Sequence, residues 1–188
     1  MLSKFIKTKM KYDGRQLSPL WAYQNFNLLG DSIVSWVGAC NVDLKNMVDA
    51  EDQISNSKIC GDLMLHFIIE VFDRELFSAV CLQRIMASLI KDYLHENSKI
   101  LQSGPGLVRD GDDLFWQKQK LSISIASCSA VSNQIHFAVN DVNKGTPVKT
   151  CCLNDFKIKP EDLAKDIMER FISEYKSIKM ATQKVHPL

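Results

Sequence analysis

The chain has 188 residues, of which 46% are hydrophobic, 24% charged and 9% aromatic, which excludes a disordered, collagen-like or low-complexity protein. Its 23 Lys and Arg against 22 Asp and Glu give a formal charge of +1, so electrostatics offers no case for binding nucleic acid or a membrane surface.

The chain is expected to form a single domain over residues 1–188, because its length suits one core and no linker or repeat divides it. No segment approaches the ~20 consecutive apolar residues that span a bilayer. The basic N-terminus has no apolar signal-peptide core. The six cysteines contain no CxxC pair, so we expect reduced thiols, no metal site and a soluble cytoplasmic protein.

The N-terminal part alternates turns with short apolar segments. Pro19 precedes LWAYQNFNLL, which suits a short helix, and SIVSWVGA predicts a strand that ends at Gly38. Polar residues 46–62 predict a loop or a short helix. The apolar run Leu63–Val71 predicts a buried strand with His66 and Glu70 on one face. Such a pair could act in acid–base chemistry, although a satisfied pair in the core is the commoner arrangement.

The C-terminal part contains the two clearest helices. The first begins near Glu75, where apolar residues recur at three- and four-residue spacing as far as Tyr93. A Gly-Pro-Gly turn follows, after which DLFWQ, KLSISIA and NQIHFAVNDV predict strands. Pro160 begins the second helix, whose apolar face runs from Leu163 to Tyr175. This order predicts an α+β domain with a mixed or antiparallel sheet and helices packed on one side.

Two neighbouring predicted strands contain most of the polar candidates. Alternation places Lys120, Ser122 and Ser124 on one face of the first strand, and His136 and Asn140 on one face of the second. A face of small polar side chains can form the floor of a ligand cleft, because it leaves room and supplies hydroxyl groups. An ordinary antiparallel sheet with one face in water gives the same alternation, and the pattern alone favours that interpretation.

Four short motifs follow one another between Pro105 and Asn154. They are Asp112-Asp113-Leu114, Lys120-Leu121, His136-Phe137-Ala138-Val139-Asn140 and Thr150-Cys151-Cys152. In this order they resemble the core of the biotin/lipoate protein ligase and octanoyltransferase superfamily. Over its whole length the chain resembles more closely the family known as domain of unknown function 366. The segments that support this second resemblance are Tyr12–Trp36, Met47–Asp52, Met64–Asp73, Gly111–Ser127, Ile135–Asn140 and Gly145–Thr150.

The superfamily resemblance implies a class II synthetase-like, biotin/lipoate ligase-like fold and roles for individual residues. The lysine that matches Lys120 contacts the carboxyl or acyl phosphate of the substrate, where an ammonium stabilises a developing oxyanion. The cysteine that matches Cys151 forms an acyl thioester in the transferases, whereas a small buried hydrophobe is the commoner role of a cysteine. Only the resemblance distinguishes Cys151 from Cys152. Arg109 and Asp113 are expected to line the same cleft as Lys120.

The chain departs from the superfamily at two points. The Arg-Gly-Gly-Gly-type loop of the ligases corresponds here to Ser57–Leu63, which retains only Gly61. Phe137 replaces the glycine that follows the matching histidine, which would narrow a tunnel for a fatty chain.

The first hypothesis is therefore an acyl-transfer or ligase enzyme that acts on a small carboxylate or acyl substrate. Lys120 would stabilise the substrate oxygen while Ser122, Ser124, His136 and Asn140 shape the pocket. A carrier protein could supply the acyl acceptor, and the chain could form a homodimer. The alternative is a non-catalytic relative that binds a small acidic ligand or a protein partner. The sequence indicates no particular cofactor.

Overall fold

The computed structural model describes residues 1–72 and 75–186, and its main sheet has five strands. In spatial order these are β1 (Leu2–Ile6), β2 (Ser32–Val42), β3 (Ile59–Val71), β8 (Asn133–Asn140) and β7 (Ser122–Cys128). Strand β1 runs parallel to β2, and the other neighbouring pairs are antiparallel. A smaller sheet contains β4 (Val108–Asp110), β5 (Asp113–Trp116) and β6 (Gln119–Lys120).

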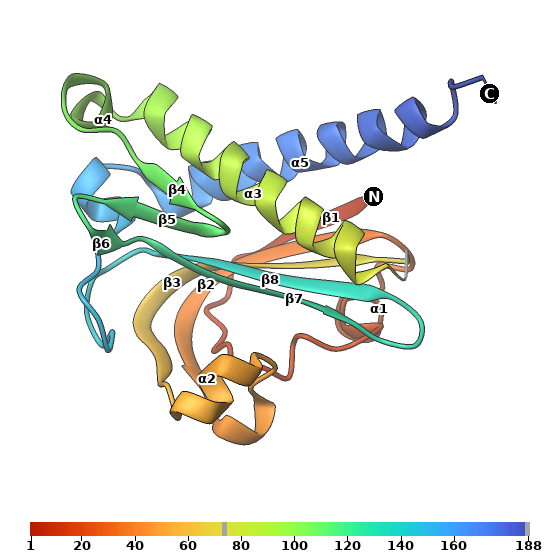
Figure 1. The fold of residues 1–188 in the computed structure, drawn as a ribbon, viewed down its shortest axis with the longest axis horizontal. Helices are drawn as coiled ribbons and strands as arrows, with labels where there is room; N and C mark the ends of the chain where they lie inside the picture. Colours follow the sequence, from red (N-terminus) through yellow and green to blue (C-terminus); the bar gives the residue numbers. More distant parts are fainter. Residues whose placement is uncertain (73–74, 187–188) are drawn as a thin grey trace.

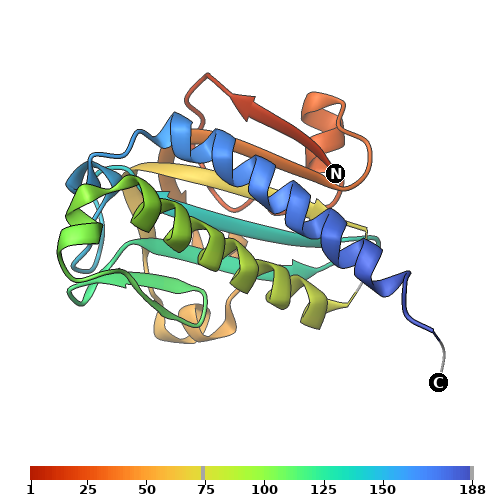
Figure 2. The ribbon, with the colours of Figure 1, turned by 90° about the horizontal axis from the view of Figure 1, so that it is seen from above.

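Two long helices cover one face of the main sheet. Helices α3 (Leu76–Asn97) and α5 (Pro160–Thr182) lie side by side across it, as Figures 1 and 2 show. The alternation of the strands directs Phe67 and Phe137 toward these helices, where Phe171 of α5 joins them in the larger core cluster. Each fully buried apolar side chain of this kind contributes about 1.5–3 kcal/mol. The predicted α+β fold with helices on one side is therefore confirmed.

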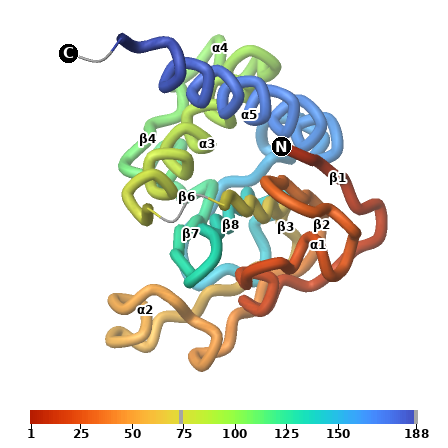
Figure 3. Tube along the Cα trace, turned by 90° about the vertical axis from the view of Figure 1, so that its right-hand side faces the viewer, coloured from red at the N-terminus to blue at the C-terminus, as the bar shows by residue number. Residues whose placement is uncertain are grey.

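The second face of the sheet is covered by shorter segments. The chain around Tyr12 and helix α1 (Trp21–Phe26) pack on it with Trp36 and Met64 in a smaller apolar cluster. A 3-10 helix (Leu44–Asn46) and α2 (Ala50–Ser55) form an excursion between β2 and β3. Figure 3 shows this excursion on the side of the sheet opposite to α3 and α5. Helix α2 is capped by Asp49, whose carboxylate accepts from the amides of Glu51 and Asp52.

Strand β2 does not end at Gly38, as the sequence suggested, but continues to Val42 with an irregular register between Gly38 and Cys40. The glycine has another function, because the chain at Met10 crosses β2 at this position. A Cβ added at Gly38 would lie 1.8 Å from the carbonyl oxygen of Met10. The indole N–H of Trp36 donates to that same carbonyl at 2.7 Å. Glycine is thus required here by a close approach of backbone rather than by a turn.

Two elements have no counterpart in the sequence prediction. Strand β1 is an edge strand with its first three residues exposed, so it lacks the buried alternation that marks a strand. Helix α4 (Lys99–Ser103) has five residues, too few for a helical period to emerge. A second 3-10 helix spans Leu153–Phe156. Within the described residues, no helix has both the length and the apolar character that would let it cross a membrane.

Candidate functional site

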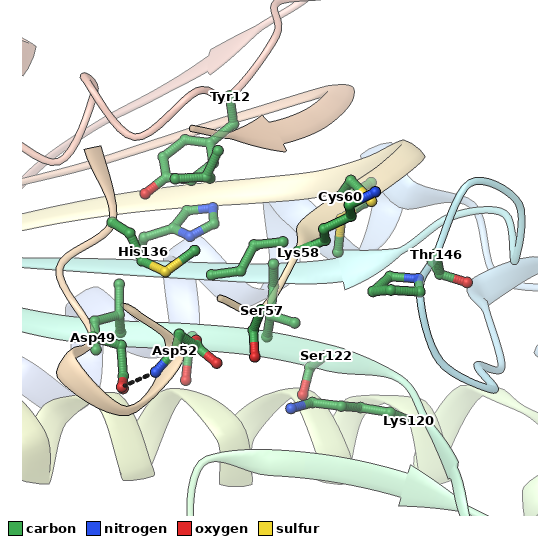
Figure 4. A pocket seen from close by; sticks show the side chains of 18 of the residues that line it. Tyr12, Asp49, Asp52, Ser57, Lys58, Cys60, Lys120, Ser122, His136 and Thr146 are labelled. Carbon is green, nitrogen blue, oxygen red and sulfur yellow. Dashed lines mark hydrogen bonds between the residues drawn. The ribbon is translucent and has the colours of Figure 1, made fainter. Parts of the chain in front are cut away.

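A cavity of about 550 Å³ lies between the second face of the sheet and the excursion that joins β2 to β3. Its floor comes from β3, β7 and β8, and its wall comes from the excursion and from the loop that contains Thr146 (Figure 4). The apolar part of the floor consists of Met64, Ile123 and Ile125. The volume lies within the range of small-molecule sites. We call this space the sheet cavity.

Lys120 stands on the wall of the sheet cavity and is fixed through its backbone. Its amide donates to the carbonyl of Lys149, and its own carbonyl accepts from Asn140 Nδ2 at 3.2 Å. The ammonium Nζ lies 2.7 Å from a carboxylate oxygen of Asp113, in side chains that are about 30% exposed. Burial raises the pKa of Asp113, and Lys120 opposes that effect. The arrangement holds a cation at the cavity wall with part of its surface available to a ligand.

Ser122 and Ser124 support the hairpin next to Lys120 rather than lying on the same face as His136. The register pairs Ser124 with Phe137 and Ile125 with His136, and paired residues of an antiparallel ladder share a face. The grouping of these serines with His136 and Asn140 on one face is therefore wrong. Strand β7 is an edge strand, so both serines still border the cavity at its rim.

The two hydroxyl groups have partners on the hairpin. Ser122 Oγ accepts from the amide of Leu114 at 3.0 Å. Ser124 Oγ donates to Asp112, whose carboxylate also accepts from Gln83 Nε2 at 2.8 Å. Because Gln83 belongs to α3, these bonds tie the hairpin that positions Lys120 to the helix layer.

Two buried histidines form a hydrogen-bonded pair, of which His136 borders the cavity and His66 lies behind it. His66 Nδ1 lies 3.1 Å from His136 Nε2, and His66 Nε2 lies 3.1 Å from the carbonyl oxygen of Gly38. Tyr12 stacks on His136 with 3.6 Å between ring centroids, and Trp36 stacks on His66. Burial lowers the pKa of His66 to about 4 and lowers that of His136 well below its usual value. Both rings are therefore neutral near pH 7.

The expected pairing of His66 with Glu70 does not occur. Glu70 Oε1 instead accepts from the amide of Leu20 at 2.8 Å and from Ser132 Oγ at 2.6 Å. These two bonds connect three separate segments of the chain beyond the histidines. Glu70 thus has a structural role and does not border the sheet cavity.

Cys151 and Arg109 lie away from the sheet cavity. The Cys151 side chain is fully buried in the cluster between the sheet and the helices, and burial raises the pKa of its thiol to about 12. This places it where a small apolar residue would stand and leaves no thiolate near neutral pH. Cys152 is also buried, with its thiol directed at Asp155. Arg109 is exposed on β4 and donates to the carbonyl of Gly111.

The structure brings six of the eight predicted residues to the cavity: Lys120, Asp113, Ser122, Ser124, His136 and Asn140. It adds residues that the sequence did not assign to the site, namely Tyr12, Lys58 and the acidic side chains of the excursion. The capping signal at Asp49 identifies a helix start, but nothing local indicates that this helix folds over the sheet.

The lining is acidic, with five carboxylates against two lysines. The carboxylates are Asp49, Glu51, Asp52, Asp112 and Asp113, and the lysines are Lys58 and Lys120. Within residues 1–72 and 75–186, no three or more His, Cys, Asp or Glu side chains are arranged so that they could hold a metal ion.

Comparison with known proteins places the chain in a family. The family model DUF366, a domain of unknown function, matches residues 1–186. The chain belongs to this family. The uncharacterized protein MJ0805 of Methanocaldococcus jannaschii is 32% identical over 192 residues, which cover 98% of this chain and 84% of that protein. The structure of a protein of unknown function from Pyrococcus horikoshi matches with a TM-score of 0.91 at 33% identity, covering 99% of this chain and 98% of that one.

More distant matches of this DUF366 protein are biotin and lipoate ligases. The biotin protein ligase of Aquifex aeolicus in complex with biotin and ATP matches with a TM-score of 0.61 at 12% identity, covering 95% of this chain and 72% of that one. LipL1 of P. falciparum in complex with lipoate matches with a TM-score of 0.54 at 13% identity, covering 93% and 63%. At such identities the likeness concerns the fold alone, and it confirms the ligase-like fold class expected from the sequence.

Proposed function

We propose that the sheet cavity binds a small carboxylic acid or its acyl derivative, with the carboxyl end at Lys120. The observation behind this proposal is a lysine fixed at the wall of a cavity that has an apolar floor. An ammonium has three N–H donors, so Lys120 can keep Asp113 and still donate to a ligand oxygen. Each methylene of the ligand that is buried against Met64, Ile123 and Ile125 would contribute ~0.8 kcal/mol.

If the protein is an enzyme, the same lysine supports acyl transfer. An ammonium beside the carbonyl stabilises negative charge on its oxygen as a nucleophile attacks, and this effect grows in a site shielded from water. The acceptor would be an amine or thiol of a carrier protein, brought from outside the cavity. Cys151 has no part in this proposal, because its thiol is buried outside the cavity with a raised pKa. The ligands of the ligase neighbours, biotin with ATP and lipoate, support an acid of this class.

The alternative is a relative that binds such an acid without activating it. The excess of carboxylates over lysines in the lining favours this alternative, since it opposes the binding of a nucleoside triphosphate. The segment over residues 57–63 contributes one cation to the lining, Lys58, and contains a single glycine, Gly61, in place of the glycine run that lets backbone amides surround a phosphate. A cytoplasmic location and a homodimer stay predictions.

Thermal unfolding with octanoate, lipoate, biotin and ATP tests the proposal. An acid present at 100 times its Kd should stabilise the protein by about 2.7 kcal/mol. Lys120→Ala should weaken the binding of that acid at least tenfold, because a hydrogen bond to a charged group contributes about 1.5–3 kcal/mol. Lys165→Ala, on the exposed side of α5, is the matched control and should bind normally. Equal binding by the Lys120 and Lys165 variants would show that the site is misplaced.

A second measurement separates the two functions. Incubation with ATP and the bound acid should release pyrophosphate if the protein activates the acid, and Lys120→Ala should abolish that release. Tight binding of the acid without pyrophosphate release, and without transfer from an acyl donor to a carrier protein, would establish the non-catalytic alternative.

A further inference from the structure

The histidine pair, of which His136 borders the sheet cavity, has a hydrogen-bond direction that is fixed at one end. The carbonyl oxygen of Gly38 can only accept, so the ring nitrogen that faces it, His66 Nε2, must have the hydrogen. His66 is completely buried among aromatic rings, which disfavours the imidazolium form. A neutral ring with hydrogen on Nε2 has a lone pair on Nδ1. His66 Nδ1 is therefore an acceptor.

This assignment determines the tautomer of the second ring. His66 Nδ1 faces His136 Nε2 at 3.1 Å, so His136 must donate from Nε2. His136 is 2% exposed and equally shielded, which keeps it neutral as well. Its hydrogen is then on Nε2, and its lone pair is on Nδ1. The pair thus carries a directed chain of hydrogen bonds from the cavity floor to the Gly38 carbonyl.

The nitrogen at the start of this chain, His136 Nδ1, has no hydrogen-bond partner within residues 1–72 and 75–186. Among the described residues none donates to His136 Nδ1, and this atom is not among the buried polar atoms sealed from the surface. His136 borders the sheet cavity beneath the ring of Tyr12, as Figure 4 shows. When a bound ligand displaces water from such an acceptor without donating to it, the binding free energy becomes less favourable by about 1–3 kcal/mol. The occupant of the cavity can remove this cost by supplying a donor.

We propose that the acid bound in the sheet cavity has a neutral O–H or N–H group at the end remote from its carboxyl group, and that this group donates to His136 Nδ1. This inference rests on the proposed function and specifies its substrate class as an ω-hydroxy, amide or ureido acid rather than a plain fatty acid. The Tyr12 hydroxyl also borders the cavity and can donate or accept by rotation, whereas His136 has a single fixed role.

The spacing along β8 indicates the size of the ligand. His136 and Asn140 are four residues apart on β8, or ~13 Å at ~3.3 Å per residue. Asn140 bonds to the backbone carbonyl of Lys120, which places the Lys120 backbone near the far end of this interval, whereas the ammonium lies at the end of a side chain that extends from there beneath Ser57 (Figure 4). The interval therefore gives only the order of size of the ligand, whose middle would lie over the apolar floor and whose best length is found with a series of acids.

Three matched acids test the inference by calorimetry: a parent fatty acid, its ω-hydroxy derivative and its ω-methoxy derivative, in a series from octanoate to dodecanoate. The methoxy compound retains the oxygen but has no donor. At the best length the hydroxy acid should bind about tenfold more tightly than the methoxy acid, the effect of one hydrogen bond to a shielded acceptor. Equal affinities would overturn the inference. Binding by none of the acids would overturn the inference and the proposed function together.

Two variants separate the inference from the proposed function. His136→Phe retains a ring for Tyr12 to stack on and should abolish the preference for the hydroxy acid over the methoxy acid. Lys120→Ala should weaken all three acids by the same factor. If Lys120→Ala has this effect while wild type shows no preference for the hydroxy acid, the proposed function stands and the inference fails.

Nitrogen-15 NMR of the wild-type histidines tests the tautomers without any variant. Long-range proton–nitrogen spectra should show both buried rings with hydrogen on Nε2 alone, beside the exposed references His95 and His186. Addition of the ω-hydroxy acid should shift one unprotonated Nδ1 resonance in the direction of hydrogen-bond acceptance. A ring with hydrogen on Nδ1, or a cationic ring at neutral pH, would contradict the proposal.

Discussion

Acidification should destabilise this protein, because His66 takes up a proton in the unfolded chain at pH values where the buried ring of the folded protein stays neutral. Burial lowers the pKa of His66 to about 4 in the folded state, against about 6.5 in an unfolded chain. Between these values the unfolded state binds the extra proton, so the free energy of unfolding falls as the pH falls. Each pH unit below 6.5 costs about 1.4 kcal/mol, which amounts to about 2 kcal/mol at pH 5 and about 3 kcal/mol at pH 4. His136 adds to this loss in the same direction.

Urea unfolding of wild type and His66→Gln at a series of pH values isolates the contribution of His66. Glutamine can still donate to Gly38 and accept from His136, but it does not titrate. The carboxylates are common to both proteins, so they cancel in the difference between the two unfolding free energies. Between pH 7 and pH 5 the wild-type protein should lose about 2 kcal/mol of unfolding free energy relative to the variant. Parallel curves would refute the assignment of a neutral, buried His66.

Three further predictions concern stability and reactivity. Gly38→Ala should lower the free energy of unfolding by about 3 kcal/mol, because its Cβ would meet the Met10 backbone, whereas Gly106→Ala, with open space around it, should be nearly neutral in urea unfolding. Iodoacetamide at neutral pH should modify exposed Cys81 well before Cys151, as judged by mass spectrometry, and early labelling of Cys151 would restore it as a candidate nucleophile. Asp31→Asn should cost about 1–3 kcal/mol in thermal unfolding, because its carboxylate accepts from the Phe72 amide, the Tyr175 hydroxyl and the Lys179 ammonium; an unchanged Tm would show that these bonds contribute nothing net.

Periodicity predicted the parts of the fold in which local pattern and tertiary contact agree. Helix α5 begins at Pro160 and buries the face that ends at Tyr175, as its sequence indicates. The faces of β3 and β8 are also correct, because both strands are central and have a helix layer on one side. The two faces of β7 were assigned incorrectly, because β7 is an edge strand on which Ser124 finds a polar partner in Gln83 of α3 and Ser122 finds one in the Leu114 amide of the hairpin.

The candidate site was only partly accessible to sequence reasoning. Lys120 and Asp113 are seven residues apart on one hairpin, so a local motif is sufficient to associate them. Tyr12 and His136 meet across most of the chain, and no local signal reports such a contact. The tautomer of His136 depends on a carbonyl two hydrogen bonds away, which only the structure identifies.

The close crossing at Gly38 connects the fold to the chemistry of the cavity. The crossing chain continues from Met10 to Tyr12, whose backbone bonds to Ala39 and Asn41 on β2 and so places the phenol ring on His136. The carbonyl oxygen of Gly38 requires a hydrogen-bond donor, and His66 Nε2 supplies it. The neutral His66 ring then has a lone pair on Nδ1, and this lone pair requires a donor, which is His136 Nε2. Two apolar residues in place of the histidines would leave that carbonyl without its side-chain donor, so the first bond has a structural reason. The second bond places the remaining lone pair of His136 at the cavity floor, where none of the described residues donates to it and water or the ligand can do so.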